Sequence, residues 1–317
     1  MGMLLVPILL LAQNANPTPV PAAYEYIREG AKEDVVKETR PGYVLMGGGS
    51  DVAAAFSWMI ERANGGDFLV LRATGTGAYN PFIHKQGTLN SVATLILKTR
   101  EASEDPAVLD HIRKAEAIFF AGGDQWHYVS RWKGTALQRV LQERIQAGVP
   151  TGGTSAGLAI LGQYVFSAEQ DSITSGQALL DPFDERMTIT SDFLSVPFLD
   201  EVITDSHFTA RGRMGRLVAF LARIATDEKI PRAHGIGVDE GTAVLLQPDG
   251  TALIEGRGSA YFLETTREAD ECRAGQPLVI RDVRVYRVAK GGRFDFPSWR
   301  GTDGEASSVS AAAGKLQ

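Results

Sequence analysis

Cysteine is almost absent from this chain of 317 residues, which contains only Cys272. A single cysteine excludes a disulfide within the chain and any metal site built from several thiolates. Cys272 lies in the polar segment 271–275 with no histidine close to it in sequence, so no neighbouring side chain is expected to activate it as a nucleophile. Thiol chemistry is therefore not expected.

Clusters of basic residues are missing as well. Lys and Arg number 32 against 38 Asp and Glu, which leaves a net charge of −6. No block of Lys and Arg of the kind that grips a phosphate backbone is present, so a nucleic-acid partner is not expected. The hydrophobic content of 44% is ordinary for a globular protein with a core of its own.

The apolar run near the N-terminus, residues 3–12, is too short to span a bilayer. Small and polar residues follow it at 13–17, a pattern typical of a signal-peptide core, although no Lys or Arg precedes the run. We therefore expect export to the periplasm or the medium, with no membrane attachment after processing. The alternatives are a core-packing N-terminal strand or a mis-assigned start codon in a cytoplasmic protein.

From residue 42 onward, short runs of β-branched and aromatic residues alternate with longer segments of helical spacing. This alternation is typical of parallel strands joined by helices, so the sequence predicts a doubly wound, mostly parallel α/β sheet sandwiched by helices. Strands are expected at 43–46, 68–73, 117–120 and just before 155, and helices from near 51 and at 105–115, 135–147 and 212–225.

The last part of the chain has another pattern. Pro248-Asp249-Gly250 marks a hairpin turn between alternating runs at 241–264, which predicts an antiparallel C-terminal extension of the same domain. The expected divisions are a signal peptide at 1–16, a linker and N-terminal segment at 17–41, one α/β domain at 42–300, and a disordered Gly-, Ser- and Ala-rich tail at 301–317.

The segment Gly153-Thr154-Ser155-Ala156-Gly157 has the pattern Gly-x-Ser-x-Gly. Such a pattern places a serine on a sharp turn between a strand and a helix, where small neighbours permit a strained backbone and the next amide can face an oxyanion. A strand-like run precedes Ser155 and an apolar helical turn follows it. The alternative is a glycine-rich turn that only connects two elements.

A nucleophilic serine needs a base, and the chain has five histidines. His207 is favoured because it ends the strand-like run 202–206 and is followed by Arg211, Arg213 and Arg216, a spacing that indicates an anion site. The alternative is a solvated helix start with ordinary surface arginines. His111, on the polar side of a helix pattern, and His234, in a loop, are expected at the surface, whereas His84 and His127 stay open.

Two glycine turns follow expected strands. Gly122-Gly123-Asp124-Gln125 lies at the edge where open α/β sheets bind ligands, so its amides and Gln125 could hold a substrate, although it could also be a plain strand-to-helix turn. Gly47-Gly48-Gly49 does not complete a dinucleotide-binding Gly-x-Gly-x-x-Gly pattern, because Val52 stands at its last position.

These blocks, together with Asp205-Ser206-His207-Phe208 and the segment 235–240, resemble the cyanophycinase family of serine peptidases in the family's own order. The resemblance implies a flavodoxin-like fold, akin to class I glutamine amidotransferases, often dimeric and without a metal or organic cofactor. It also implies exopeptidase cleavage of cyanophycin or related β-aspartyl (isoaspartyl) peptides. The implied site has Ser155 as nucleophile, His207 as base, and a substrate pocket shaped by Gln125, Asp205, Arg211, Arg213 and Arg216. For acyl transfer at this site we predict that backbone amides near Gly123 and Ala156 hold the oxyanion.

The third member of the triad departs from the family pattern. An ungapped reading puts Ile173 where the family's glutamate is expected, and the nearest acids are Asp171, which we predict for the role, and Glu169. Asp205 is a further candidate, since residues two apart on a strand share a face. The departure leaves open a catalytically weak or silent protein that binds aspartate-rich ligands, and an esterase on the same scaffold is the other alternative.

Helical spacing restricts the three arginines. If 211–216 is helical, at most two of them face one pocket, and the pair must include Arg213 unless the segment before Gly212 is extended and frees Arg211. The sequence therefore predicts that Arg213 binds a substrate carboxylate.

Export can be tested on the mature protein. We expect N-terminal sequencing of the protein from its native host to find cleavage between Ala12 and Asn16. A protein that still begins at Met1 in the cytoplasm contradicts this expectation.

Overall fold

The computed structural model of the chain describes residues 22–317. The apolar run at 3–12 and its predicted cleavage site lie outside these residues. In the part of the chain that is described, no helix combines the length and the apolar character needed to cross a membrane.

The first sheet has a parallel centre, as the sequence predicts. Its five parallel strands run in the spatial order β4 (Ser91–Leu97), β3 (Asp67–Arg72), β5 (Ala117–Phe120), β6 (Thr151–Thr154) and β2 (Tyr43–Met46). Antiparallel strands continue it on both sides to ten in all: β1 (Tyr24–Gly30) beside β4, and β11 (Thr242–Leu246), β12 (Thr251–Gly256), β15 (Arg293–Asp295) and β16 (Arg300–Gly301) beyond β2.

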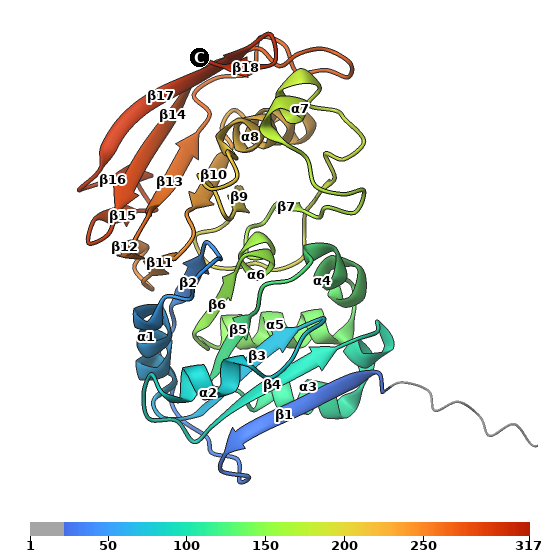
Figure 1. The fold of residues 1–317 in the computed structure, drawn as a ribbon, viewed down its shortest axis with the longest axis vertical. Coiled ribbons are helices and arrows are strands. Elements are labelled where there is room, and N and C mark those ends of the chain that lie inside the picture. The colour runs from blue at the N-terminus through green and yellow to red at the C-terminus, as the bar shows by residue number, and fades with distance from the viewer. Residues whose placement is uncertain (1–21) are drawn as a thin grey trace, which may run out of the picture.

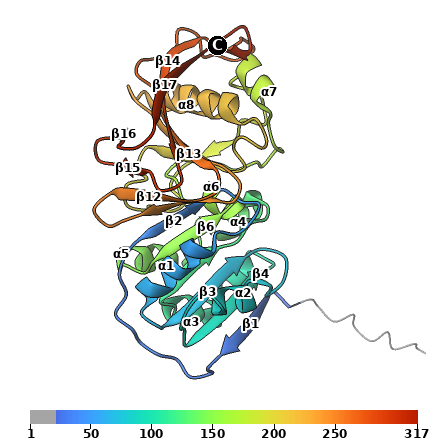
Figure 2. The same cartoon turned by 60° about the vertical axis from the view of Figure 1, so that its left-hand side comes forward.

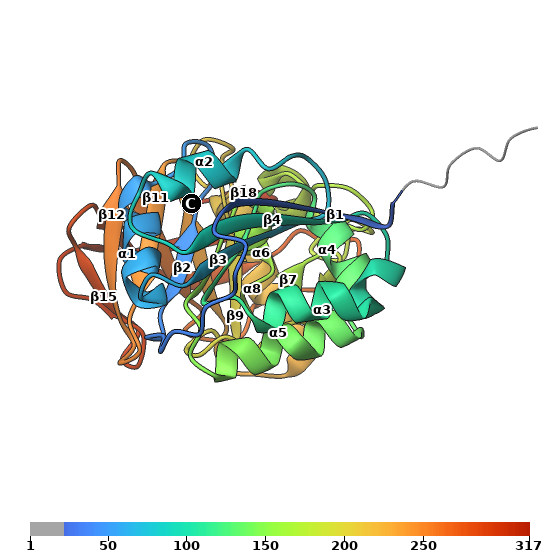
Figure 3. The same ribbon diagram turned by 90° about the horizontal axis from the view of Figure 1, so that it is seen from below.

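Helices cover both faces of this sheet, so its central strands are apolar on both sides. Phe119 and Phe120 are neighbours in β5 and point to opposite faces: Phe119 packs with the layer of α1 and Phe120 with that of α3. Figure 3 shows α2 on one side of β3 and β4, and α3 and α5 on the other. The helices are α1 (Ala53–Ala63), α2 (Tyr79–His84), the 3₁₀ helix η1 (Glu101–Glu104), α3 (Pro106–Arg113), α4 (Gln125–Trp132) and α5 (Ala136–Gln146).

A second sheet of six strands stacks beyond the carboxyl ends of the parallel strands (Figures 1 and 2). Its core packs on α8 (Met214–Glu228), where Phe220 and Leu221 are fully buried. Its strands lie in the order β18 (Lys315–Leu316), β17 (Glu305–Ala312), β14 (Ile280–Ala289), β13 (Ser259–Glu264), β10 (His234–Val238) and β9 (Val202–Asp205). The remaining elements are α6 (Ala156–Ala159), β7 (Val165–Phe166), α7 (Ser175–Leu180) and β8 (Ile189–Thr190).

The predicted fold class, a mostly parallel α/β sheet with an antiparallel C-terminal extension, is confirmed. The predicted hairpin is formed by β11 and β12 around Pro248-Asp249-Gly250. The extension is larger than the sequence indicates, because its later strands build the second sheet with β9 and β10.

Two expected divisions are corrected. Residues 301–317 are not a disordered tail, since β17 pairs with β14 from Glu305 to Ala311 and carries β18 at its end. Within the predicted linker and N-terminal segment, residues 22–41 contain a strand, since β1 pairs with β4 along its whole length. Both strands bury few apolar side chains and are paired to their neighbours by backbone hydrogen bonds, which composition alone does not reveal.

The fold brings five strand ends to one place. The carboxyl ends of β2, β5 and β6 lie side by side in the first sheet, and those of the parallel pair β9 and β10 face them from the second. Residues that directly follow these strands therefore meet where open α/β sheets bind ligands.

Candidate active site

Ser155 lies on the turn between β6 and α6. Its backbone has φ 53° and ψ −114°, a conformation that a residue with a side chain rarely adopts. The two flanking glycines make this turn fit, because a Cβ at Gly153 would collide with the carbonyl of Gly157, and one at Gly157 with the carbonyl of Phe120. The predicted strand–Ser155–helix turn is present, with its glycines required by close backbone packing.

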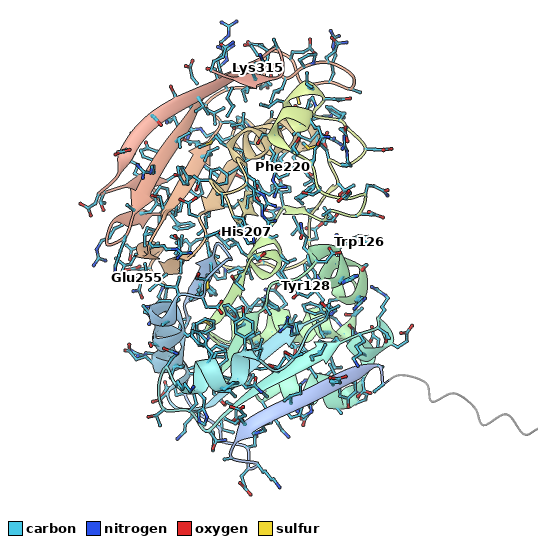
Figure 4. The ribbon with its side chains drawn as sticks, viewed as in Figure 1. Trp126, Tyr128, His207, Phe220, Glu255 and Lys315 are labelled. Carbon is cyan, nitrogen blue, oxygen red and sulfur yellow. The ribbon has the colours of Figure 1, made fainter. Side chains whose placement is uncertain are left out.

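His207 follows β9 and contacts Ser155 directly. Its Nε2 lies 2.8 Å from Ser155 Oγ, and its Nδ1 lies 2.6 Å from Oε1 of Glu240. With the Glu240 carboxylate ionised, Nδ1 keeps its proton and donates a hydrogen bond to Glu240, which leaves the lone pair of Nε2 to accept the Ser155 hydroxyl proton. Figure 4 places His207 between α6 and the layer of α8.

The acid beside His207 is Glu240, not Asp171 or Glu169. Asp171 accepts a hydrogen bond from the amide of Ser172, and Ile173 is buried against α8. Asp205 does not contact the imidazole either, because two arginines hold its carboxylate.

The sequence contained an indication that Glu240 belongs to the site, although the ungapped comparison with the family pattern pointed to the region of Ile173. It stands two residues after the end of β10, as His207 stands two residues after the end of β9, and the two strands are parallel neighbours. The strand-end rule that singles out His207 therefore points to Glu240 as well.

The arginines after His207 are divided into two kinds. Arg216 binds Asp205 through two hydrogen bonds of 2.7 and 2.6 Å, and Arg213 binds the same carboxylate at 3.0 Å and the carbonyl of Ser206 at 2.8 Å. Arg211 is exposed, and among residues 22–317 its guanidinium has no hydrogen-bond or ion-pair partner. Only Arg211 keeps all its donors for a ligand.

The helical constraint on these arginines does not hold, because α8 begins at Met214 and both Arg211 and Arg213 precede it. All three guanidinium-bearing residues line the cavity beside Ser155, but Arg213 is held by Asp205. That Arg213 binds a substrate carboxylate stays a prediction, and Arg211 is a second candidate whose guanidinium is not held by Asp205.

The cavity measures about 110 Å³ and is mainly polar. Gln125, at the start of α4, points toward it and donates a 3.4 Å hydrogen bond to the carbonyl of Phe166. Gly123 and Ala156 also line it, together with Ser155. Its lining consists of Gly123, Gln125, Ser155, Ala156, Ala159, Phe166, Thr204, Asp205, Ser206, His207, Arg211, Arg213 and Arg216.

Charge and burial set the protonation of the site. Burial lowers the pKa of His207; the hydrogen bond to Glu240 opposes this, and the positive charges of Arg211 and Arg213 lower it further. The pKa of Glu240 is lowered mainly by its hydrogen bond from His207. A neutral imidazole and an ionised carboxylate are thus favoured near neutral pH, which is the state needed to accept a proton from Ser155.

The other candidates lie away from this site. His111 stacks on Tyr26 with ring centroids 3.7 Å apart, His234 opens β10 beside Glu264, and His84 and His127 lie in α2 and α4. Burial raises the pKa of the Cys272 thiol, so it is not a ready thiolate. Within residues 22–317, no group of three or more His, Cys, Asp or Glu side chains is arranged to hold a metal ion.

The sequence profile of Peptidase family S51 matches residues 73–254, which include Ser155, His207 and Glu240. The chain belongs to peptidase family S51. It is accordingly a serine hydrolase of that family, and the resemblance to cyanophycinases is confirmed.

Relatives of this S51 peptidase include a cyanophycinase of Trichormus variabilis, 27% identical over 223 residues that cover 69% of each chain. A cyanophycinase of Geminocystis herdmanii is 28% identical over 63% of this chain and 70% of its own, and Peptidase E of Shewanella amazonensis is 27% identical over 53% and 65%. A crystal structure of a peptidase from an acI-B1 Actinobacterium shares the fold, with a TM-score of 0.56 and 17% identity over 81% of this chain and 98% of that one.

The pKa of His207 provides a direct test of this geometry. We expect an NMR titration to place it below 6.5, and Arg211→Ala to raise it, because the substitution removes a positive charge that disfavours the imidazolium. Arg273→Ala, a change at an exposed arginine that pairs with Glu271, is the control and should leave the His207 pKa unchanged. An unchanged or lower pKa in Arg211→Ala contradicts the arrangement.

Proposed function

We propose that this S51 peptidase hydrolyses cyanophycin or related β-aspartyl (isoaspartyl) peptides through an acyl-enzyme on Ser155. The observation that carries the proposal is the hydrogen-bonded series Ser155–His207–Glu240 beside the unpartnered guanidinium of Arg211. A nucleophile, a base and an orienting carboxylate in contact are the parts that acyl transfer needs.

In the first half of the reaction, His207 Nε2 takes the proton of Ser155 while Oγ bonds to the carbonyl carbon of the substrate. We assign stabilisation of the oxyanion to the backbone amides of Gly123 and Ala156, two residues that line the cavity with Ser155. His207 then gives its proton to the leaving amine, the C–N bond breaks, and Ser155 carries the acyl group.

In the second half, water loses a proton to His207 and its oxygen attacks the acyl carbon. Collapse of this intermediate breaks the bond to Ser155 Oγ, which regains its proton from His207. Glu240 accepts the Nδ1 proton in a hydrogen bond throughout, so it orients the imidazole and stabilises the imidazolium without taking the proton.

The charge of the cavity supports an acidic substrate. Asp205 neutralises part of the charge of Arg213 and Arg216, while Arg211 adds a full positive charge close to His207. A guanidinium offers two parallel donors to a carboxylate, which suits the free carboxylate of an aspartyl residue. The names of the cyanophycinase relatives agree with this preference.

The two alternatives lose support from the site. A silent binding protein was favoured by the lack of a triad acid at Ile173, and Glu240 supplies that acid. An esterase acting on neutral esters has no use for the free guanidinium of Arg211. Export, and a homodimer as the family resemblance implies, remain proposals that rest on the sequence alone.

Removing the nucleophile tests the proposed chemistry. We expect Ser155→Ala to lower kcat by about three orders of magnitude or more and to abolish the adduct formed with a serine-directed phosphonate, because the substitution removes the hydroxyl that carries the acyl group in this mechanism. Glu240→Gln should lower kcat by about 10³–10⁴-fold with the fold intact, since the amide disfavours the required tautomer of His207. Asp171→Asn is the matched control and should keep near wild-type activity. A folded Ser155→Ala protein that retains activity overturns the proposal.

Arg211 tests the substrate class. We expect Arg211→Ala to raise KM for a β-aspartyl dipeptide by about 10- to 100-fold, which corresponds to losing a charge-assisted hydrogen bond of roughly 1.5–3 kcal/mol. KM for an analogue with the carboxylate replaced by an amide should change little. Steady-state kinetics on both substrates measures the difference, and Arg211→Lys should be intermediate because it keeps the charge without the paired donors. An equal loss on both substrates contradicts the preference for acidic peptides.

A further inference from the structure

The end of β2 and the turn Gly47-Gly48-Gly49 that follows it bind the backbone of Ser155, of His207 and of the residue after Glu240. The amide of Ser155 donates to the carbonyl of Met46 at 3.1 Å, and the amide of His207 donates to the carbonyl of Gly47 at 2.7 Å. The carbonyl of Gly48 accepts the amide of Gly241, the residue after Glu240, at 2.9 Å. One short segment therefore fixes the backbone of three distant parts of the chain.

Gly48 itself lies directly against the imidazole. Its φ is +88°, and a Cβ placed on it would lie 2.6 Å from both Cε1 and Nε2 of His207 and 3.1 Å from Cβ of Ser155. Nε2 is the atom that faces the Ser155 hydroxyl. A methyl group at this position thus competes for the space in which the base contacts the nucleophile.

The imidazole has little freedom to avoid such a group. Hydrogen bonds hold its two nitrogens at 2.8 and 2.6 Å, and the side chain of His207 is only 10% exposed. A shift of several tenths of an ångström lengthens at least one of these bonds toward the distance at which it no longer forms. Misplacement of a reacting group by about 1 Å lowers a rate by about 10²-fold.

We propose that Gly48 is a positioning residue of this site: the absence of a side chain there lets the imidazole of His207 lie between Ser155 and Glu240. The inference rests on the proposed function, because it assigns Gly48 a role in keeping the base in place. It predicts that a methyl group at Gly48 impairs the base more than the binding of the substrate, since Arg211 lies outside the collision.

The chain supplies a matched control for backbone strain. Gly291 has φ +82°, close to that of Gly48, but a Cβ there would meet no atom within 4 Å. Both Gly48→Ala and Gly291→Ala place an L residue in a left-handed conformation, and only the first adds a contact with His207.

We expect Gly48→Ala to lower kcat by about 10²-fold with KM changed less than about threefold. The rate of phosphonate labelling of Ser155 should fall in parallel, and the downfield NMR resonance of the His207 Nδ1 proton should shift or disappear. Gly291→Ala should keep the wild-type value of each quantity. Wild-type labelling and kcat in a folded Gly48→Ala protein overturn the positioning role. Absence of labelling in the wild-type protein instead overturns the nucleophile assignment, so the two failures are distinguishable.

A double-mutant cycle covers the case in which Gly48→Ala folds poorly. In a His207→Ala background the imidazole is gone, so Gly48→Ala should lower Tm less than it does in the wild-type chain, since only the backbone strain and the milder 3.1 Å approach to Ser155 Cβ remain. An equal loss of Tm in both backgrounds means that the cost of Gly48→Ala does not come from contact with the imidazole, and it overturns the inference.

Discussion

The site depends on the close contact between the turn after β2 and the end of β10. A Cβ at Gly47 would collide with the carbonyl of Asp239, so the two segments approach as closely as backbones can. At this point the chain leaves the second sheet through Asp239–Gly241 and enters the first sheet as β11, which pairs with β2. The two sheets are joined where His207 and Glu240 face Ser155. The packing between the sheets therefore sets the relative positions of these three residues.

Asp205 decides how much positive charge the cavity offers. Its side chain is 4% exposed, as is that of Arg216, and a charge at that depth costs several kcal/mol if it loses its partner. The two arginines that it binds are therefore part of the structure, and their hydrogen bonds keep the end of β9 next to the start of α8. The same binding lowers the net charge beside the base and leaves Arg211 as the guanidinium with all donors available.

The C-terminal strands contribute indirectly. β13, β14 and β17 extend the sheet that contains β9 and β10, and together with α8 they bury Leu263, Ile280 and Val283. The strand that leads to Glu240, β10, is thereby paired on both sides, and β9, which leads to His207, is paired with β10 at the edge of the sheet. Rigid supports of this kind suit a hydrogen-bonded series that tolerates little displacement.

The sequence by itself determined those features that depend on a few neighbouring residues. The alternation of strands and helices, the sharp turn at Ser155 and the strand-end position of His207 follow from local spacing, because side-chain periodicity and close backbone packing act over a few residues. Only the tertiary structure decided that Glu240 rather than Asp171 meets His207, that Asp205 holds Arg213, and that β17 is a strand. Each of these depends on which segments, far apart in the sequence, lie next to each other in space. The spacing of residues along the chain does not contain that information.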